Sequence, residues 1–363
     1  MNQGRVYPEQ YQALLAEKAE QLKSLLGDFE LPPLEVFPSP PRHYRLRAEF
    51  RVWHEGDDIF YAMFAPGDKR QPLRIDSCPM VSERIENTMF ELLEVIRGNP
   101  VLRRKLFQVD FLSTLSGELL VTLLYHRPLG DDWQQAARPL RERFGIDIIG
   151  RSRKTKLVMD RDFVVERFKL GERELLYKQV ENSFTQPNGE INRAMLGWAL
   201  DATAGRGGDL LELYCGNANF SIALAPNFRR VLATELAKSS VRAAEDNIRA
   251  NGIENLTVAR LSSEEFSQAM AKVRPFRRLQ HIDLDSYAFS TVLVDPPRAG
   301  LDAGTEALVQ QYPAIVYISC NPETLRHNLA GLTQTHRIAR LALFDQFPYT
   351  DHKECGVLLV RND

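Results

Sequence analysis

Short apolar runs alternate with amphipathic segments along the second half of the chain. Runs with the pattern of buried strands occupy residues 209–213, 230–235, 256–260, 290–294 and 314–319, and segments with helical spacing separate them. Strands that alternate with helices form a parallel sheet covered by helices on both faces. The pattern predicts an α/β domain with a doubly wound sheet over residues 181–363, and a ligand beyond the carboxyl ends of its central strands.

The end of the chain departs from this alternation. Residues 337–344 and 356–360 are two strand-like runs with no helical segment between them. Such a terminal hairpin inserts an antiparallel strand into an otherwise parallel sheet. This feature distinguishes the class I (Rossmann-like) methyltransferase sheet from ordinary dinucleotide-binding sheets, so we expect a class I fold with an antiparallel terminal strand.

Strands dominate the first half of the chain. Residues 44–53 and 59–64 have the pattern of paired strands, residues 83–97 that of a helix, and residues 107–115 and 119–125 that of a hairpin. An amphipathic helix and a proline-rich linker precede them. We expect residues 1–180 to form an N-terminal α+β region.

Basic residues also gather in this first half. Segments 42–51, 103–105 and 151–156 each hold three or four Lys or Arg side chains, although the net charge of the chain is −2. That net charge argues against indiscriminate coating of nucleic acid, but it leaves room for a local basic face. We interpret residues 1–180 as an RNA-binding region; the alternative for each cluster is an ordinary solvated surface.

Composition narrows the class of protein further. Hydrophobic residues make up 44% and charged residues 26%, as in globular proteins that bury a core. No apolar run is long enough to cross a membrane, and the N-terminus lacks the apolar core of a signal peptide, so we expect a cytoplasmic protein. The cysteines at positions 78, 215, 320 and 355 are widely spaced, which predicts reduced thiols and no metal or iron–sulfur cluster.

A strand, a tight turn and a helix follow one another around Gly216. This glycine permits a backbone conformation that other residues resist, and it lets a ligand approach closely. Glu235 ends the next strand 19 positions later (235 minus 216), where a carboxylate can accept hydrogen bonds from ribose hydroxyls. A single glycine does not make the three-glycine pyrophosphate fingerprint, which favours S-adenosylmethionine over a dinucleotide. On their own, Gly216 and Glu235 are a weak signal for a cofactor site. The alternative is a turn with a purely structural role and an acidic residue on the surface.

The sequence Val294-Asp295-Pro296-Pro297-Arg298 closes the fourth strand of the predicted sheet. Two prolines forbid helix and strand pairing and stiffen the backbone. A rigid loop that carries a carboxylate beside a cofactor suits group transfer, which depends on near-attack geometry. The same Asp-Pro-Pro motif also occurs in methyltransferases that modify exocyclic amino groups.

The next strand ends at Ser319-Cys320-Asn321-Pro322, which places a thiol at the carboxyl edge of the sheet. Pro322 and Glu323 suit a helix start, whose N-terminus is expected to lower the pKa of the Cys320 thiol. A thiolate that adds to carbon 6 of uracil makes carbon 5 nucleophilic enough to accept a methyl group. We therefore predict that Cys320 is a nucleophile, although a buried inert cysteine is the alternative.

This chemistry needs a base that removes the proton from carbon 5 before the thiol can leave. Glu354 stands at the start of the last strand, on a loop expected to fold back over the pocket. A half-buried carboxylate there can hold a raised pKa. His352 is the rival base, and the spacing favours Glu354 only modestly.

Five motifs together resemble the RNA 5-methyluridine methyltransferases, and among these most closely the bacterial tRNA (uracil-5-)-methyltransferases. The motifs are Ser183–Asn188, Leu213–Phe220, Val294–Gly300, Ser319–Pro322 and His352–Cys355; residues 44–51 and 105–108 extend the likeness over nearly the whole chain. The resemblance implies that Cys320 is the nucleophile and Glu354 the base. It also implies that adenosylmethionine contacts Gln186, Tyr214, Asn219, Glu235 and Asp295.

The RNA target follows from the resemblance and from the cysteine count. Relatives that modify ribosomal RNA tend to carry an iron–sulfur cluster on closely spaced N-terminal cysteines, whereas only Cys78 precedes residue 215 here. This favours tRNA, and the resemblance implies uridine 54 of the T-loop, which must be extruded before a thiol can reach it. Phe107 is expected to stack on RNA, with a core position as the alternative, and Arg47 and Arg51 to contact phosphates.

Alternative functions remain open on the sequence alone. The same reaction on ribosomal RNA or another T-loop-like RNA is the nearest of them. Amino-group methylation through Asp295 is the second, and an RNA-folding or RNA-binding protein with incidental methylation is the third. No obligatory protein partner is evident from the sequence.

Overall fold

The computed structural model describes residues 6–64 and 71–362, and these form two compact units. Unit 1 comprises residues 6–9, Pro40–Arg167 and Gln179–Gly189, and unit 2 comprises Gln10–Ser39, Phe168–Lys178 and residues 190–362. This division differs from a single boundary between residues 180 and 181, because the N-terminal helix and the segment after it pack in unit 2. Within the described residues, no helix is both long and apolar enough to cross a membrane.

Unit 2 is an α/β structure. Its helices are α1 (Tyr11–Leu25), α5 (Gly189–Ala202), α6 (Asn219–Leu224), α7 (Lys238–Ala250), α8 (Ser263–Met270), α9 (Ala303–Val309) and α10 (Pro322–Leu332). Its strands are β1 (Leu34–Phe37), β11 (Asp209–Leu213), β12 (Arg230–Thr234), β13 (Leu256–Ala259), β14 (Phe289–Val294), β15 (Ala314–Ser319), β16 (His336–Phe344) and β17 (Glu354–Arg361). Short 3-10 helices cover Ala225–Asn227, Arg277–Leu279 and Leu284–Ser286.

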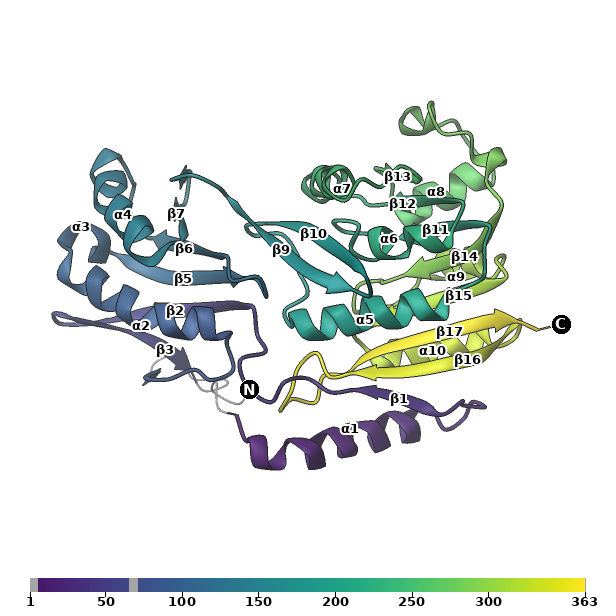
Figure 1. The fold of residues 1–363 in the computed structure, drawn as a ribbon, viewed down its shortest axis with the longest axis horizontal. Helices are drawn as coiled ribbons and strands as arrows, with labels where there is room; N and C mark the ends of the chain where they lie inside the picture. Colours follow the sequence, from purple (N-terminus) through teal and green to yellow (C-terminus); the bar gives the residue numbers. More distant parts are fainter. Residues whose placement is uncertain (1–5, 65–70, 363) are drawn as a thin grey trace. The chain divides into compact units, whose positions relative to one another are not determined.

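The strands of unit 2 form one sheet in the order β1-β16-β17-β15-β14-β11-β12-β13 (Figure 1). Strand β17 runs antiparallel between β15 and β16, whereas the other neighbouring pairs are parallel. The predicted class I sheet with an antiparallel terminal strand is therefore confirmed. The proline-rich linker prediction is wrong in part, because Leu34–Phe37 pairs with β16 as the edge strand β1.

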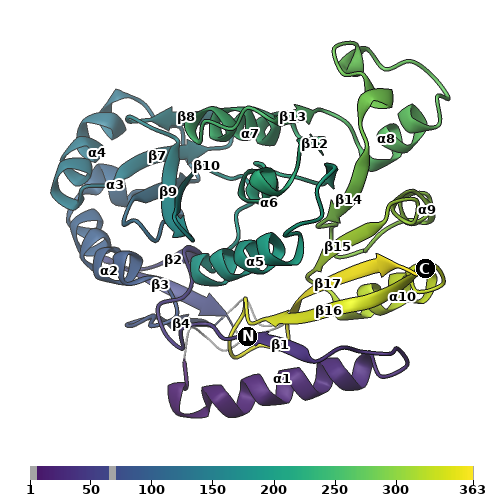
Figure 2. The same ribbon diagram turned by 45° about the vertical axis from the view of Figure 1, so that its right-hand side comes forward.

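Helices cover both faces of this sheet, because alternate side chains of each strand point to opposite faces. One core contains Leu211 and Val292 with residues of α1, α8, α9 and α10. The other contains Leu210 and Leu293 with residues of α5, α6 and α7. Figure 2 shows α5 and α6 apart from α1 and α10. Full burial of one leucine side chain stabilises the fold by roughly 1.5–3 kcal/mol. Burial of the side chains on both faces therefore holds the strands, and with them the strand ends, in fixed positions.

Unit 1 is an α+β structure, as predicted. Its helices are α2 (Glu83–Gly98), α3 (Pro100–Arg103) and α4 (Asp131–Phe144), and a 3-10 turn covers Pro8–Gln10 at the border with unit 2. Its strands are β2 (Arg47–Glu55), β3 (Asp58–Phe64), β4 (Pro72–Arg74), β5 (Leu106–Ser113), β6 (Leu119–Tyr125), β7 (Asp147–Ser152) and β8 (Thr155–Val158). They form a mixed sheet in the order β4-β3-β2-β5-β6-β7-β8, and the pair β9 (Phe163–Leu170) and β10 (Arg173–Val180) runs along the chain from one unit into the other.

Candidate active site

The turn after β11 contains three residues with positive φ, a backbone conformation that most residues avoid. Tyr214, Gly216 and Ala218 have φ values of 62°, 56° and 65°, in the left-handed region. Backbone strain of this kind concentrates at ligand sites. The Gly216 N–H donates a hydrogen bond of 3.0 Å to Glu235 Oε2, which ties the turn to the end of β12. A Cβ on Gly216 would meet no atom within 4 Å, so the glycine faces open space.

Carboxyl groups surround this turn. Glu212 is 1% exposed, and one of its oxygens accepts a hydrogen bond from Ser221 Oγ. Its other oxygen, Oε1, has no hydrogen-bond partner among the described residues. Burial raises the pKa of Glu212 to about 8 and the pKa of Asp295 to about 7. A cationic ligand would stabilise both carboxylates, whereas a pyrophosphate would be repelled. The site thus fits adenosylmethionine, which carries a sulfonium and an ammonium group.

Tyr214 and Asn219 are anchored by their own neighbours in unit 2. The Tyr214 hydroxyl donates a hydrogen bond of 2.9 Å to Ser263 Oγ at the start of α8. Asn219 Nδ2 donates one of 2.7 Å to Asn192 Oδ1 on α5. Both residues therefore lie at the turn in fixed orientations, at the carboxyl edge of the sheet.

The loops after β14 and β15 are bonded to each other. Asn321 Nδ2 donates a hydrogen bond of 3.0 Å to the carbonyl oxygen of Arg298, and Thr324 Oγ1 donates one of 3.2 Å to the same oxygen. Asn321 also caps helix α10, because its Oδ1 accepts from the backbone N–H of Glu323. These contacts fix the backbone that follows Cys320 relative to the loop after Asp295.

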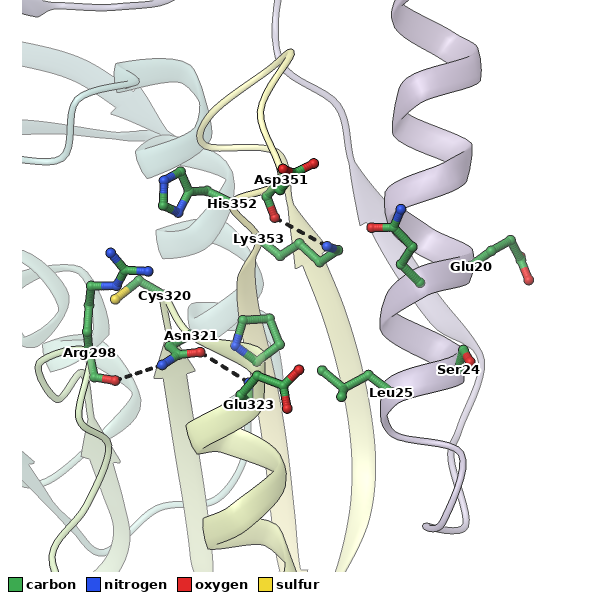
Figure 3. Close-up of a pocket in the computed structure, with 12 residues that line it drawn as sticks. Glu20, Ser24, Leu25, Arg298, Cys320, Asn321, Glu323, Asp351, His352 and Lys353 are labelled. Atoms are coloured by element: carbon green, nitrogen blue, oxygen red, sulfur yellow. Dashed lines mark hydrogen bonds between the residues drawn. The ribbon is translucent and has the colours of Figure 1, made fainter. Parts of the chain in front are cut away.

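Cys320 is partly exposed in a pocket of about 810 Å³ (Figure 3). Arg298 lies beside its sulfur in the close-up, and His352 lies on the same side of the pocket. Helix α1 forms the opposite wall with Glu20, Gln21, Ser24 and Leu25. The nucleophile expected from the sequence is therefore accessible to a ligand.

Glu354 is the first residue of β17, the strand that pairs with β15, and it lies next to Cys320. Ser319 pairs with Cys355 in the antiparallel register of β15 and β17, so the next positions on the two chains are Cys320 and Glu354. Glu354 is 4% exposed, and burial together with the charge of Asp295 raises its pKa well above the usual range. A carboxyl group with a raised pKa suits a role in proton transfer.

The predicted lowering of the Cys320 pKa is wrong in this structure. Burial, together with the charges of Glu354 and Asp295, raises the pKa of the Cys320 thiol to about 11. Burial and the nearby carboxylates therefore raise the thiol pKa although α10 begins beside it. The carboxylates also imply that a cation in the site would favour the thiolate.

His352, the rival base, is exposed in the same pocket. Burial and the charges of Arg298 and Lys18 lower its pKa, so the imidazole is neutral at neutral pH. A neutral imidazole can also accept a proton. The choice between Glu354 and His352 therefore stays a prediction.

In unit 1, Phe107 lies outside the hydrophobic core, and two other side chains pack against its ring. Its ring stacks on His126 with centroids 4.0 Å apart, and Arg51 Cζ lies 3.5 Å from the ring centroid. Phe107 and His126 line a pocket of about 970 Å³. Arg51 and Glu49 are exposed on one face of β2, whereas Arg47 is half-buried and donates a hydrogen bond of 2.8 Å to the carbonyl oxygen of Ser183.

The family model described as tRNA (Uracil-5-)-methyltransferase matches residues 10–362. This chain belongs to that family. A relative from Shewanella loihica, named tRNA/tmRNA (uracil-C(5))-methyltransferase, is 59% identical over 99% of this chain and 100% of its own length. A relative of the same name from Pectobacterium carotovorum is 60% identical over 97% of each chain.

A solved structure has the same fold. The Pyrococcus abyssi tRNA (uracil-54, C5)-methyltransferase, crystallised with S-adenosyl-L-homocysteine, superposes with a TM-score of 0.72. It is 23% identical and is matched over 96% of this chain and 83% of its own. At this identity the likeness concerns the fold alone.

For this family member, the structure brings most of the predicted site residues together in unit 2. Seven of them lie at the carboxyl edge of one sheet: Cys320, Glu354, Asp295, Glu235, Gly216, Tyr214 and Asn219. Gln186 lies in unit 1, so its contact with the cofactor stays a prediction. Glu212 and His126 were not predicted from the sequence. A carboxylate inside the apolar run Leu210-Leu211-Glu212-Leu213 was the signal for the first, and an exposed aromatic pair across a hairpin leaves no sequence signal for the second.

Proposed function

We propose that this protein transfers a methyl group from S-adenosylmethionine to carbon 5 of uridine 54 in the T-loop of tRNA, in the cytoplasm. The observation that carries the proposal is the position of Cys320 opposite Glu354, at the edge where Asp295 and the Gly216 turn also lie. The family and the names of the relatives support the substrate and the methyl donor.

The reaction follows from the chemistry of uracil. The Cys320 thiolate adds to carbon 6, which forms a sulfur–carbon bond and an enolate centred on carbon 5. Adenosylmethionine, when bound, supplies an electrophilic methyl group to that carbon. Glu354 then removes the proton from carbon 5, the carbon 5–carbon 6 double bond re-forms, and the sulfur–carbon bond breaks to release the thiolate. Glu354 passes its proton to water afterwards.

Residues of the turn and its neighbours would hold the methyl donor. Glu235 lies where it can accept hydrogen bonds from ribose hydroxyls, and Gly216 gives the ligand room to approach. Glu212 and Asp295 supply negative charge for the cationic groups. Tyr214 and Asn219 complete the proposed contacts in unit 2, and the contact expected of Gln186 stays a prediction.

Unit 1 would bind the RNA. A flipped or splayed base can extend the stack of Arg51, Phe107 and His126, and Arg51 can also interact with the phosphate backbone. Arg47 keeps its predicted role as a phosphate contact, although its guanidinium also holds the Ser183 carbonyl.

The test is methylation of unmodified tRNA transcript by purified protein with labelled S-adenosylmethionine. Mass spectrometry of nuclease fragments is expected to find 5-methyluridine at position 54, and a transcript with cytidine at position 54 should stay unmodified. Cys320→Ala should abolish the product. Parallel reactions with ribosomal RNA and with tmRNA, which appears in the names of the relatives, measure the range of substrates. Methylation of an amino group, or full activity of Cys320→Ala, would overturn the proposal.

A further inference from the structure

Helix α1 holds the loop that carries Glu354 by means of a buried ion pair. Lys18 Nζ lies 2.7 Å from Asp345 Oδ1, and the two side chains are 7% and 1% exposed. The same ammonium donates a hydrogen bond of 2.8 Å to the carbonyl oxygen of Phe347. A buried ion pair contributes little to stability because desolvation opposes it, but it can fix one arrangement of the elements that it joins.

Tyr11, two turns before Lys18 on the same face of α1, reaches the same loop. Its hydroxyl donates a hydrogen bond of 2.9 Å to Asp345 Oδ2 and accepts one of 2.7 Å from the backbone N–H of Ser39. Its ring packs edge-on against Tyr349, with centroids 5.8 Å apart. Tyr349 has a φ of 61°, which an L-residue adopts only when its surroundings enforce it.

These contacts fall on alternate residues of one segment. Asp345 follows the last residue of β16, and Glu354 is the first residue of β17, so residues 345–353 form the connection. Helix α1 contacts Asp345, Phe347 and Tyr349 within this connection. The charge of Lys18 also reaches His352, whose pKa it helps to lower.

Cys320 is positioned by other groups. Asn321 and Thr324 join its backbone to the Arg298 carbonyl, and neither bond involves the connection. The backbone beside Cys320 and the 345–353 connection are therefore held by separate anchors, and Cys320 and His352 both line the pocket whose opposite wall is α1 (Figure 3).

We propose that Lys18 and Tyr11 are positioning residues that clamp the 345–353 connection, and so set Glu354 and His352 against Cys320. The clamp deepens the proposed function, on which its catalytic consequence rests. When the clamp is loosened, the thiol still adds to carbon 6, but removal of the carbon 5 proton slows. The covalent adduct should therefore accumulate while turnover falls.

The first experiment needs neither RNA nor cofactor. The rate of Cys320 alkylation by iodoacetamide is measured by peptide mass spectrometry for Lys18→Met and Tyr11→Phe. Tyr312→Phe is the matched control, because it removes a buried hydroxyl of unit 2 that has no hydrogen-bond partner among the described residues. Lys23→Met is the control for an exposed lysine of α1. A loosened connection should speed alkylation at least 3-fold in both test variants, whereas both controls should match the wild type.

The second experiment compares turnover with the fraction of enzyme in covalent complex with tRNA on a denaturing gel. The proposal expects kcat to fall about 10-fold in Lys18→Met, and less in Tyr11→Phe, while the covalent fraction at least doubles. If Lys18→Met does not fold, Tyr11→Phe decides. Turnover and covalent fraction that fall together, or alkylation rates equal to the controls, would overturn the clamp. If the wild type neither methylates tRNA nor forms an adduct, the proposed function fails, and the alkylation rates still decide the clamp.

Discussion

Cys320 and Glu354 stand opposite each other, one step beyond the Ser319–Cys355 pair that ends the register of β15 and β17. Cys320 and Glu354 come together because β17 runs antiparallel to β15. Parallel strands present their carboxyl ends at the active edge of the sheet, so a residue at the start of a parallel strand lies at the other edge. Because β17 is reversed, its first residue reaches the same edge as the residue that follows β15.

Glu354→Gln is expected to stall the reaction after the methyl group has moved. Glutamine keeps the shape of the side chain but cannot take the proton from carbon 5, so turnover should fall by about 10³-fold, within the range for loss of a general base. The covalent protein–RNA complex should persist on a denaturing gel. His352→Asn is the comparison, and a loss of less than 10-fold is expected. Normal turnover of Glu354→Gln together with a stalled His352→Asn would assign the base to His352.

The affinity for S-adenosylmethionine should rise with pH between 6 and 8. Burial raises the pKa of Asp295 to about 7, so the carboxylate that attracts the cationic ligand forms over this interval. The KM for S-adenosylmethionine should fall several-fold from pH 6 to pH 8 in the wild type. In Asp295→Asn it should be high and nearly independent of pH. An equal pH dependence in the two proteins would assign the effect to another group.

The stability of the protein without its cofactor should decline as pH rises toward 8. Burial raises the pKa of Glu212 to about 8, so the folded protein holds this proton more tightly than the unfolded chain does. The contribution is complete in acid, below the usual range of a carboxyl group, and is lost as pH rises through the folded pKa. Denaturant unfolding at pH 5.5 and 8.5 should show a decline that is smaller in Glu212→Gln by on the order of 1–3 kcal/mol. Glu264→Gln, at an exposed position of α8, should keep the wild-type slope.

Arg51→Ala and Phe107→Ala should weaken RNA binding without altering the chemical step. Loss of a stacked base costs about 1–3 kcal/mol, so the KM for tRNA should rise about 10-fold while kcat changes less than 2-fold. Arg143→Ala is the control, because Arg143 is an exposed arginine of the same unit whose partner is Glu91. A large fall in kcat at unchanged KM would show that the two residues do not act in binding.

The local pattern of apolar residues was sufficient to predict most strands of unit 2. Residues 209–213 and 314–319 were bounded as the structure has them, because fully buried strands are continuous apolar runs. Strand β1 was missed because Leu34–Phe37 is short, follows two prolines and pairs with β16, about 300 residues away. Pairing at that distance leaves no periodicity in the local sequence.

The site was predicted in its residues but not in its electrostatics. The end of β15 located Cys320, and the helix start after it suggested a lowered pKa. The thiol pKa is raised instead by burial and by two neighbours in space, Glu354 and Asp295, which come from other segments of the chain. The raised pKa of Glu212 likewise depends on burial and on residues from other segments, Asp295 and Glu235. Lys18, which precedes Asp345 by 327 positions, could not be connected with the catalytic loop from sequence.

The most direct test of the account is the denaturing gel of a T-loop stem that carries 5-fluorouridine at the target position. Fluorine replaces the proton that the base removes, so the reaction stops with sulfur bound to carbon 6. With S-adenosylmethionine, the wild type should form a complex that survives denaturation, and peptide mapping should find the RNA on Cys320. Cys320→Ala should form none. A stable complex in Cys320→Ala, or its absence in a wild type that methylates ordinary tRNA, would contradict the assignment of Cys320 as the nucleophile.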